Sequence, residues 1–239
     1  LAPGQLKARF LLQTLLEAFR LLLGADPELR QIITVTLQMS LLSTGISALL
    51  GIPLGVLIGA NDFKAKRLVN RLLHTLMGLP PVVAGLIVFL LLSRSGPLGS
   101  LKLLYSVAAM VIAQVVLITP IITGLTANVV SIKAPLIQET AAGIGLSPFR
   151  RMLYTIYECR VPFVSNILAG FGRAIAEVGA VQMVGGNVQF KTRIMTTAIM
   201  MQTNMGHFEF AIALGIVLLL ISFLVNLLVG RIQEKTLSA

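Results

Sequence analysis

Three long stretches of this chain carry no charged residue. They lie between Arg30 and Asp62, between Lys102 and Lys133, and over residues 210–230. A helix of about 20 apolar residues crosses the hydrocarbon core of a bilayer, so each stretch is long enough to span a membrane. The apolar runs are continuous and do not alternate with polar residues, which favours helices over a membrane barrel. The sequence therefore predicts an all-α polytopic membrane protein.

Two further apolar segments raise the predicted number of spans to about five. One covers residues 72–92 and contains Pro80-Pro81, which removes two backbone donors and predicts a kink. The other begins near Pro162 and fades near Gly185. Between the fourth and fifth spans, the methionine-rich and amphipathic residues 187–209 predict an outer loop with a short helix.

The N-terminal segment, residues 1–28, has a different pattern. Leucine and phenylalanine recur at helical spacing on one side of residues 11–23, and polar residues occupy the other side. This pattern predicts an amphipathic helix that lies on the membrane surface, which leaves residues 29–239 as one transmembrane domain. A sixth span is the alternative, because it would add Lys7 and Arg9 to the cytoplasmic side.

The charge distribution predicts how the spans are oriented. The chain has 19 Lys and Arg residues against 9 Asp and Glu, a formal net charge of +10. No aromatic platform accompanies these bases, so nucleic acid is not an expected partner. Because cytoplasmic loops are enriched in bases, the pattern predicts a multi-pass protein of the cell membrane with a cytoplasmic C-terminus. The predicted inner segments hold Lys64, Lys66, Arg67, Arg71, Lys133, Arg150, Arg151, Arg160, Arg231 and Lys235, against Arg94, Lys102, Lys191 and Arg193 in the outer loops.

A polar segment, residues 138–151, separates the third span from the fourth. Its residues favour a helix on each side of Gly145, which allows a tight reversal of the chain. Ser147 is a favourable N-cap residue, and Pro148 is tolerated in the first turn of a helix. The segment therefore predicts a helical hairpin on the cytoplasmic side.

The sequence Glu139-Thr-Ala-Ala-Gly-Ile-Gly145 has an acid, two small residues, and a glycine six residues after the acid. It resembles the EAA loop of type I ATP-binding-cassette (ABC) importer permeases. The resemblance implies a MetI-like transmembrane domain whose coupling loop, at about 134–160, docks on a separate ATPase. An ordinary loop helix is the alternative, and Pro162 lies further from Gly145 than the family pattern has it. The implied docking residues are Glu139, Ala141, Ala142, Gly145, Ser147, Pro148, Arg150 and Arg151.

Residues 170–187 and 192–199 are similar to the corresponding region of molybdate and sulfate permeases. The form Glu177-Val-Gly-Ala, followed by Val-Gly-Gly-Asn187, is most similar to the tungstate permeases. The resemblance implies the import of a tetrahedral oxyanion, with tungstate first, molybdate second and sulfate third. It also implies an extracytoplasmic oxyanion-binding protein, a second copy of this chain and a pair of ABC ATPase subunits as partners, within membrane lipid.

Arg173 and Glu177 are four residues apart on the predicted fourth span. Ionisable groups at this depth are costly and face protein or water. The two side chains can satisfy each other at i, i+4 spacing, or Arg173 can lend positive potential to an anion path. The other candidates for the translocation pathway or for helix packing are Gly179, Asn187, Thr192 and Thr196.

The sequence also argues against an enzyme. It lacks the Gly-x-x-x-x-Gly-Lys-[Ser/Thr] loop that cradles nucleotide phosphates, so ATP and magnesium are expected on the partner ATPase and no cofactor is expected on this chain. With His74 and His207 as its only histidines and Cys159 as its only cysteine, the chain predicts no metal site. A passive channel and an intramembrane enzyme are the alternatives from other classes. A channel needs no docking loop, and an enzyme needs a converging catalytic set.

Overall fold

The fold is known from a computed structural model, which describes residues 16, 20, 24 and 26–237. These residues form helices and connecting loops and contain no strand, which confirms the all-α prediction for them. The predicted amphipathic helix over residues 1–28 lies almost wholly outside them. The helices are α2 (Pro27–Ala60), α3 (Lys66–Met77), α4 (Pro81–Leu92), α5 (Val107–Gly143), α6 (Pro148–Glu158), α7 (Arg160–Ile175), α8 (Gly179–Gly185), α9 (Met195–Met205) and α10 (Phe208–Leu237), with a 3₁₀ turn η1 (Gly99–Leu101).

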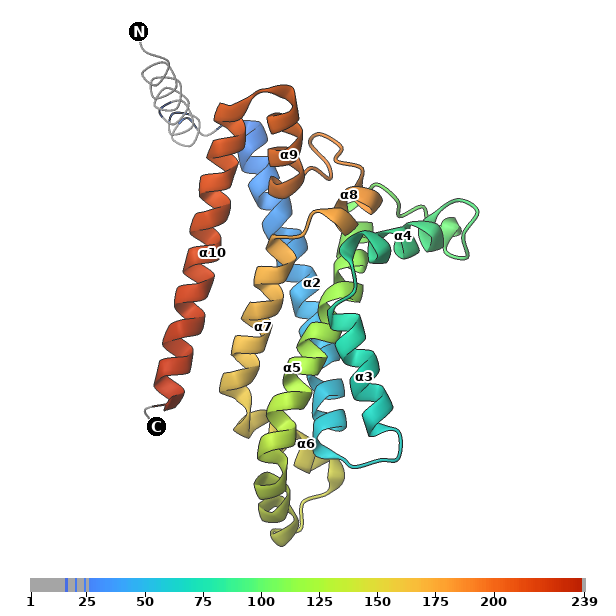
Figure 1. Ribbon diagram of the computed structural model, residues 1–239, viewed down its shortest axis with the longest axis vertical. Coiled ribbons are helices and arrows are strands. Elements are labelled where there is room, and N and C mark those ends of the chain that lie inside the picture. The colour runs from blue at the N-terminus through green and yellow to red at the C-terminus, as the bar shows by residue number, and fades with distance from the viewer. Residues whose placement is uncertain (1–15, 17–19, 21–23, 25, 238–239) are drawn as a thin grey trace.

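Four long helices, α2, α5, α7 and α10, follow the long axis of the molecule (Figure 1). α2 and α5 run in the same direction and form the most extensive helix pair. Their close approach depends on glycines, because a Cβ at Gly55 would lie 2.6 Å from the Cβ of Thr126 and one at Gly59 would lie 2.7 Å from the carbonyl oxygen of Ala127. Small residues at this spacing let membrane helices pack backbone to backbone.

Three of the described helices are long and apolar enough to cross a membrane alone, and two bent pairs raise the number to five. α3 and α4 meet at 96°, so the predicted kink at Pro80-Pro81 is a complete break, and α4 lies across the long axis (Figure 1). The second span predicted over residues 72–92 is therefore broken at the predicted position, and α3 and α4 count as one span only when they are taken together. α4 starts at Pro81 because proline fits the first turn of a helix and cannot continue a preceding one.

The fourth span is also broken, which the sequence did not predict. α7 and α8 are bent by 59° around residues 176–178. α8 packs against α4 at this level, and a Cβ at Gly85 would lie 2.7 Å from the Cα of Ala180. The short helix predicted between the fourth and fifth spans is present as α9.

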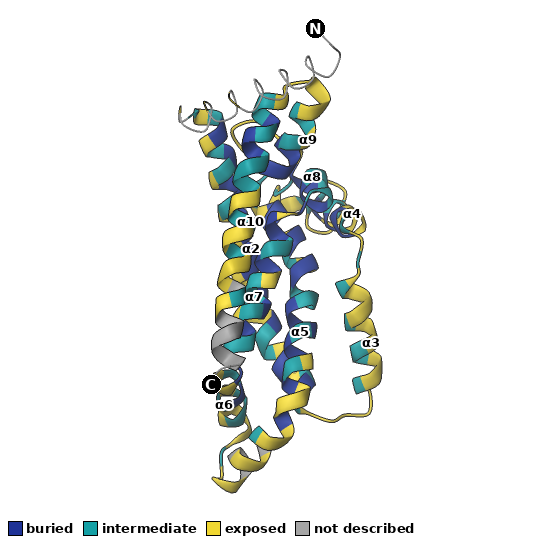
Figure 2. Cartoon of the chain, turned by 60° about the vertical axis from the view of Figure 1, so that its left-hand side comes forward, coloured by how far each residue is buried: buried dark blue, intermediate teal, exposed yellow. Residues whose placement is uncertain are grey.

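The burial pattern fits a lipid environment. Figure 2 shows buried residues between α2, α5 and α7, whereas α10 is yellow along much of its outer side. Only 17% of the most apolar stretch of 18 residues in α10 is buried. The large apolar side chains exposed in the second half of α10 are Leu219, Leu220, Phe223, Leu224, Leu227 and Leu228. Single exposed leucines are common on soluble proteins, but an exposed stripe of this length indicates contact with acyl chains.

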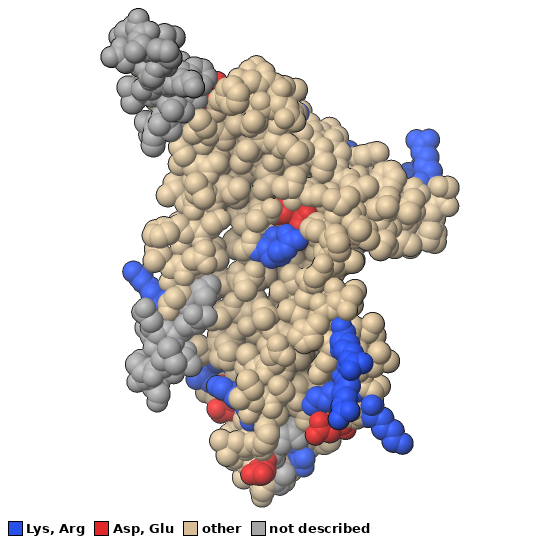
Figure 3. Space-filling view, viewed as in Figure 1, with Lys and Arg blue, Asp and Glu red and all other residues tan. Residues whose placement is uncertain are grey.

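The charged residues gather at one end of the molecule. Figure 3 shows most of the blue and red atoms at the lower end, where α2 and α5 end and α6 lies. The predicted inner loop over residues 61–71 differs in one respect: α3 already begins at Lys66, so Arg67 and Arg71 lie on a helix and not in a loop.

Candidate functional site

The segment that resembles a docking loop lies at the charged end. α5 continues through Pro120 and Pro135 to Gly143, so Glu139, Ala141 and Ala142 lie on its last turns and not on a separate helix. The first arm of the predicted hairpin is thus an extension of a spanning helix. Movement of this arm and of the spanning part of α5 is therefore mechanically linked.

The reversal at Gly145 is as predicted. Gly145 has φ of +69°, a left-handed conformation that favours glycine. α6 then starts at Pro148, with Ser147 at the N-cap position, although the Ser147 side chain makes no capping hydrogen bond. Arg151 stabilises the turn instead, because its Nε donates to the carbonyl oxygen of Leu146 at 2.8 Å.

Sequence reasoning missed an apolar stripe on α6. Phe149, Leu153 and Tyr157 are four residues apart, which places them on one face of the helix, and they are 65%, 48% and 60% exposed. Arg150 is also exposed. The opposite side of α6 lies against α2 and α5, with buried Thr155 at the contact. The exposed stripe has the chemistry of a helix face that enters a groove on a partner protein.

The candidate ion pair is formed across the break between α7 and α8. The Arg173 Nη1 donates to Glu177 Oε2 at 2.6 Å. The Glu177 side chain is 3% exposed and the Arg173 side chain 36% exposed. The sequence suggested that the two residues lie one turn apart on a continuous helix. In the structure α7 ends at Ile175, so Glu177 lies beyond the end of that helix.

Glu177 also holds the start of α8. Its Oε1 accepts a hydrogen bond from the backbone N–H of Ala180 at 3.0 Å, and Thr196 Oγ1 donates to its carbonyl oxygen at 2.7 Å. The carboxylate therefore satisfies one of the free N–H groups at a helix N-terminus and offsets the charge of Arg173. Thr196, predicted as a pathway contact, is buried in this junction.

Three more of the candidate residues support the loop structure around α8. Thr192 Oγ1 donates to the carbonyl oxygen of Gly185 at 2.6 Å and accepts from the N–H of Val188 at 2.9 Å. Asn187, at φ of +50°, accepts from Thr197 Oγ1 at 2.9 Å. Gly179 packs on α4, where its Cβ would lie 2.8 Å from a methyl group of Val82.

A buried glutamine was missed entirely by sequence reasoning. Gln114 of α5 is fully buried; its Oε1 accepts from Ser43 Oγ of α2, and its Nε2 donates to the carbonyl oxygen of Ala174 at 2.8 Å. Ala174 lies where α7 ends, and its carbonyl oxygen also accepts from the backbone N–H of Glu177 at 3.3 Å, so Gln114 supplies a further donor to this carbonyl. An amide side chain within a predicted span was the available signal.

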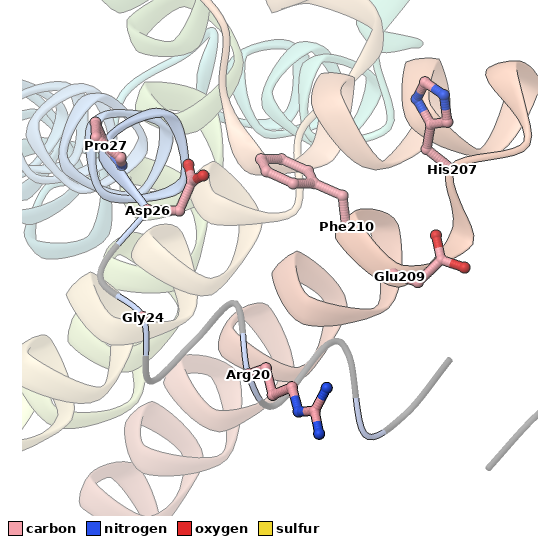
Figure 4. A pocket seen from close by; sticks show the side chains of 7 residues that line it. All are labelled: Arg20, Gly24, Asp26, Pro27, His207, Glu209 and Phe210. Carbon is pink, nitrogen blue, oxygen red and sulfur yellow. The ribbon is translucent and has the colours of Figure 1, made fainter. Parts of the chain in front are cut away.

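One cavity lies elsewhere, at the end of the molecule opposite α6. It has a volume of about 580 Å³ and is lined by Arg20, Gly24, Asp26, Pro27, His207, Glu209 and Phe210. Figure 4 shows these residues coming from the segment before α2, from the start of α2, and from the start of α10 with His207 just before it. With two carboxylates and one arginine, it does not suit an anion. No group of three metal-ligating side chains occurs among residues 26–237 or the three described residues before them.

A helical protein with broken spans and a helical hairpin at its charged end is typical of transport permeases, in which irregular backbone occurs where it faces protein or a water-filled cavity. Residues 51–238 match the model of a family described as the inner membrane component of binding-protein-dependent transport systems. This chain belongs to that family.

Three individual relatives are similar to this chain over most of its length. The tungstate uptake system permease protein TupB of Peptoclostridium acidaminophilum is 40% identical, over 91% of this chain and 96% of the relative. The probable anion ABC transporter permease protein of Haloferax volcanii is 38% identical, over 86% and 90% of the two chains. The sulfate transport system permease protein CysW of Escherichia coli is 26% identical, over 88% of this chain and 76% of the relative.

Proposed function

We propose that this chain is the permease subunit of an ATP-driven ABC importer that carries tungstate, with molybdate and then sulfate as the alternative oxyanions. The observation that carries the proposal is the 40% identity to a tungstate uptake permease over 91% of the chain. A second tungstate permease, from Campylobacter jejuni, is 35% identical over the same share, whereas the sulfate permease is 26% identical.

The energy comes from a separate ATPase, because this sequence lacks a phosphate-binding loop. ATP and magnesium bind to that partner. α6 docks on it through Phe149, Leu153 and Tyr157, with Arg150 at the edge, and Gly145 sets the angle between α6 and the end of α5. Closure of the ATPase pair moves the docking helices, and the extension of α5 transmits this movement to the spans.

The docking end faces the cytoplasm, as the basic residues gathered there support. The C-terminus of α10 lies near the same end (Figure 1) and is cytoplasmic as well. A pathway for alternating access forms between two copies of this chain, because α3 leaves a large surface that no other described residue of the same copy covers.

The ion pair between Arg173 and Glu177 keeps the affinity for the oxyanion low in the middle of the pathway. An unpaired arginine at this depth would hold a dianion tightly, and transport requires that the ion also leave. Glu177 reduces the net charge of the junction to zero while the Arg173 guanidinium stays partly exposed. High affinity then resides in the extracytoplasmic oxyanion-binding protein.

Competition for uptake tests the substrate. Proteoliposomes that contain this chain with its ATPase and binding protein should take up labelled tungstate, and unlabelled tungstate should compete better than molybdate, with sulfate weakest. If sulfate competes as well as tungstate does, the assignment of the anion is wrong while the assignment of an importer stands.

A further inference from the structure

α3 differs from the other spanning segments because none of its residues is buried. One side of it packs on α5, where Val69, Leu73 and Met77 are half-buried. Met77 fixes this contact, since a Cβ at Gly124 of α5 would lie against its sulfur atom. The remaining surface of α3 has no neighbour within the described part of this chain.

The free surface of α3 has two chemically different flanks. Leu68, Leu72 and Leu76 are four residues apart, are 59%, 54% and 42% exposed, and form an apolar flank. Arg67, Arg71 and His74, all exposed, form what we call the basic flank. Consecutive residues on a helix are about 100° apart, so the neighbours Arg71 and Leu72 point in different directions.

The charges of the basic flank are not neutralised within the described part of the chain. The carboxylate at the start of α3 belongs to Asp62, which pairs with Lys66 at 3.0 Å. Neither Arg67 nor Arg71 forms an ion pair with a described residue. Arg71 lies about 7.5 Å along the helix axis from Lys66, at 1.5 Å per residue, so its charge lies more than one turn into α3, and His74 lies about 12 Å from Lys66.

A charged flank at this depth cannot face acyl chains, because burial of an arginine in hydrocarbon costs several kcal/mol. The apolar flank suits lipid, so the basic flank must face water. The basic flank shares a face of the molecule with a second charged patch: Figure 3 shows blue atoms over the position of α3 and, higher on the same face, a blue patch touching a red one.

We propose that the basic flank of α3 lines the cytoplasmic half of the translocation pathway, where Arg67 and Arg71 attract the oxyanion after it passes Arg173. The inference rests on the proposed import function. It deepens that function by giving the two halves of the pathway different electrostatics, with a neutral pair at mid-depth and an uncompensated positive flank toward the cytoplasm. This gradient favours release of a dianion inward.

Water contact of the flank is tested by cysteine labelling, which does not depend on transport. Cys159 is replaced by alanine, and Arg71→Cys is compared with Leu72→Cys, its neighbour on the apolar flank. In nanodiscs that contain the permease with its ATPase, an anionic methanethiosulfonate reagent should modify Arg71→Cys at least about tenfold faster than Leu72→Cys, because thiols ionise only where water reaches them. Equal rates would overturn the proposal.

Uptake assays test whether the positive charge of Arg71 contributes to transport. Arg71→Gln should lower oxyanion uptake about three- to tenfold at low salt, as expected for removal of one charge near the anion, while Arg71→Lys stays within about twofold of the unmodified protein. Arg94→Gln, which removes an exposed arginine from an outer loop, is the matched control and should leave uptake unchanged. Normal uptake by Arg71→Gln contradicts the proposal, whereas no uptake by the unmodified complex contradicts the import function itself.

A lipid phosphate is the other anion that the flank could bind. The uptake defect of Arg71→Gln should be the same in vesicles of phosphatidylcholine alone and in vesicles with added phosphatidylglycerol. A defect that appears only with the anionic lipid would assign the flank to headgroups and overturn its role in the pathway.

Discussion

Loss of the Glu177 carboxylate should destabilise the junction between α7 and α8. Glu177→Ala removes a charge-assisted hydrogen bond from Arg173, which contributes about 1.5–3 kcal/mol, and a helix-capping bond to Ala180, which contributes about 1 kcal/mol. The guanidinium of Arg173 is 36% exposed and regains contact with water in the variant. We therefore expect the free energy of unfolding to fall by about 2–3 kcal/mol, near the lower end of the sum of these two contributions. For a chain of this size that lowers the unfolding temperature by about 4–12 °C.

The structure provides its own reporter for this measurement. Cys159 is the only cysteine of the chain and is fully buried, so a maleimide coumarin that fluoresces on reaction with thiols detects unfolding. Glu177→Gln should lose about half as much stability, because the amide oxygen still accepts from Ala180. Asp62→Asn is the matched control, since it removes an ion pair whose carboxylate is 99% exposed, and it should leave the melting curve unchanged.

The result for Glu177→Ala can refute the reasoning directly. An unfolding temperature within about 1 °C of the unmodified protein, where we expect a shift several times larger, would mean that the ion pair and the cap do not hold the break between α7 and α8. A shift of the same size in Asp62→Asn would mean that the assay responds to net charge.

Three further predictions concern the turn, the cysteine and the helix contact. Gly145→Val should abolish co-purification with the ATPase while the spans still insert, because only the left-handed φ of +69° opposes the new side chain, whereas Gly143→Ala should co-purify normally. Burial raises the pKa of the Cys159 thiol, so the ultraviolet absorbance of its thiolate should appear at a higher pH in the folded protein than in the unfolded chain; a lower pH would contradict this. Gly85→Val should lower the unfolding temperature, because its Cβ would lie 2.7 Å from a backbone atom of Ala180, and Gly45→Ala, with open space around it, should not.

The spans could be predicted because membrane length and apolarity are properties of single segments. The cytoplasmic turn could be predicted for a similar reason, since Gly145, Ser147 and Pro148 act on the backbone next to them. The break after α7 could not be predicted in this way. Distant residues contribute to it: Gln114, which is 60 residues away in sequence, donates to the carbonyl of Ala174, and Thr196 donates to the carbonyl of Glu177.

The roles of the polar candidates were equally dependent on distant contacts. Thr192 and Asn187 looked suitable for an anion path because hydroxyls and amides near the fourth span can bind oxyanions. In the structure their polar atoms bond to Gly185 at the end of α8, to Val188 in the loop after it, and to Thr197 on α9. The basic residues of α3 were assigned to a loop because charge was taken as the sign of a loop, whereas an amphipathic helix beside a pathway has the same composition.

Accumulation of tungstate against its gradient tests the central claim most directly. Proteoliposomes are prepared with this chain and its ATPase, with ATP inside and the binding protein and labelled tungstate outside. The account predicts that internal tungstate rises above the external concentration with ATP and not with a non-hydrolysable analogue. Internal tungstate that only equals the external concentration, at the same rate with or without ATP, would show a passive channel and contradict the account.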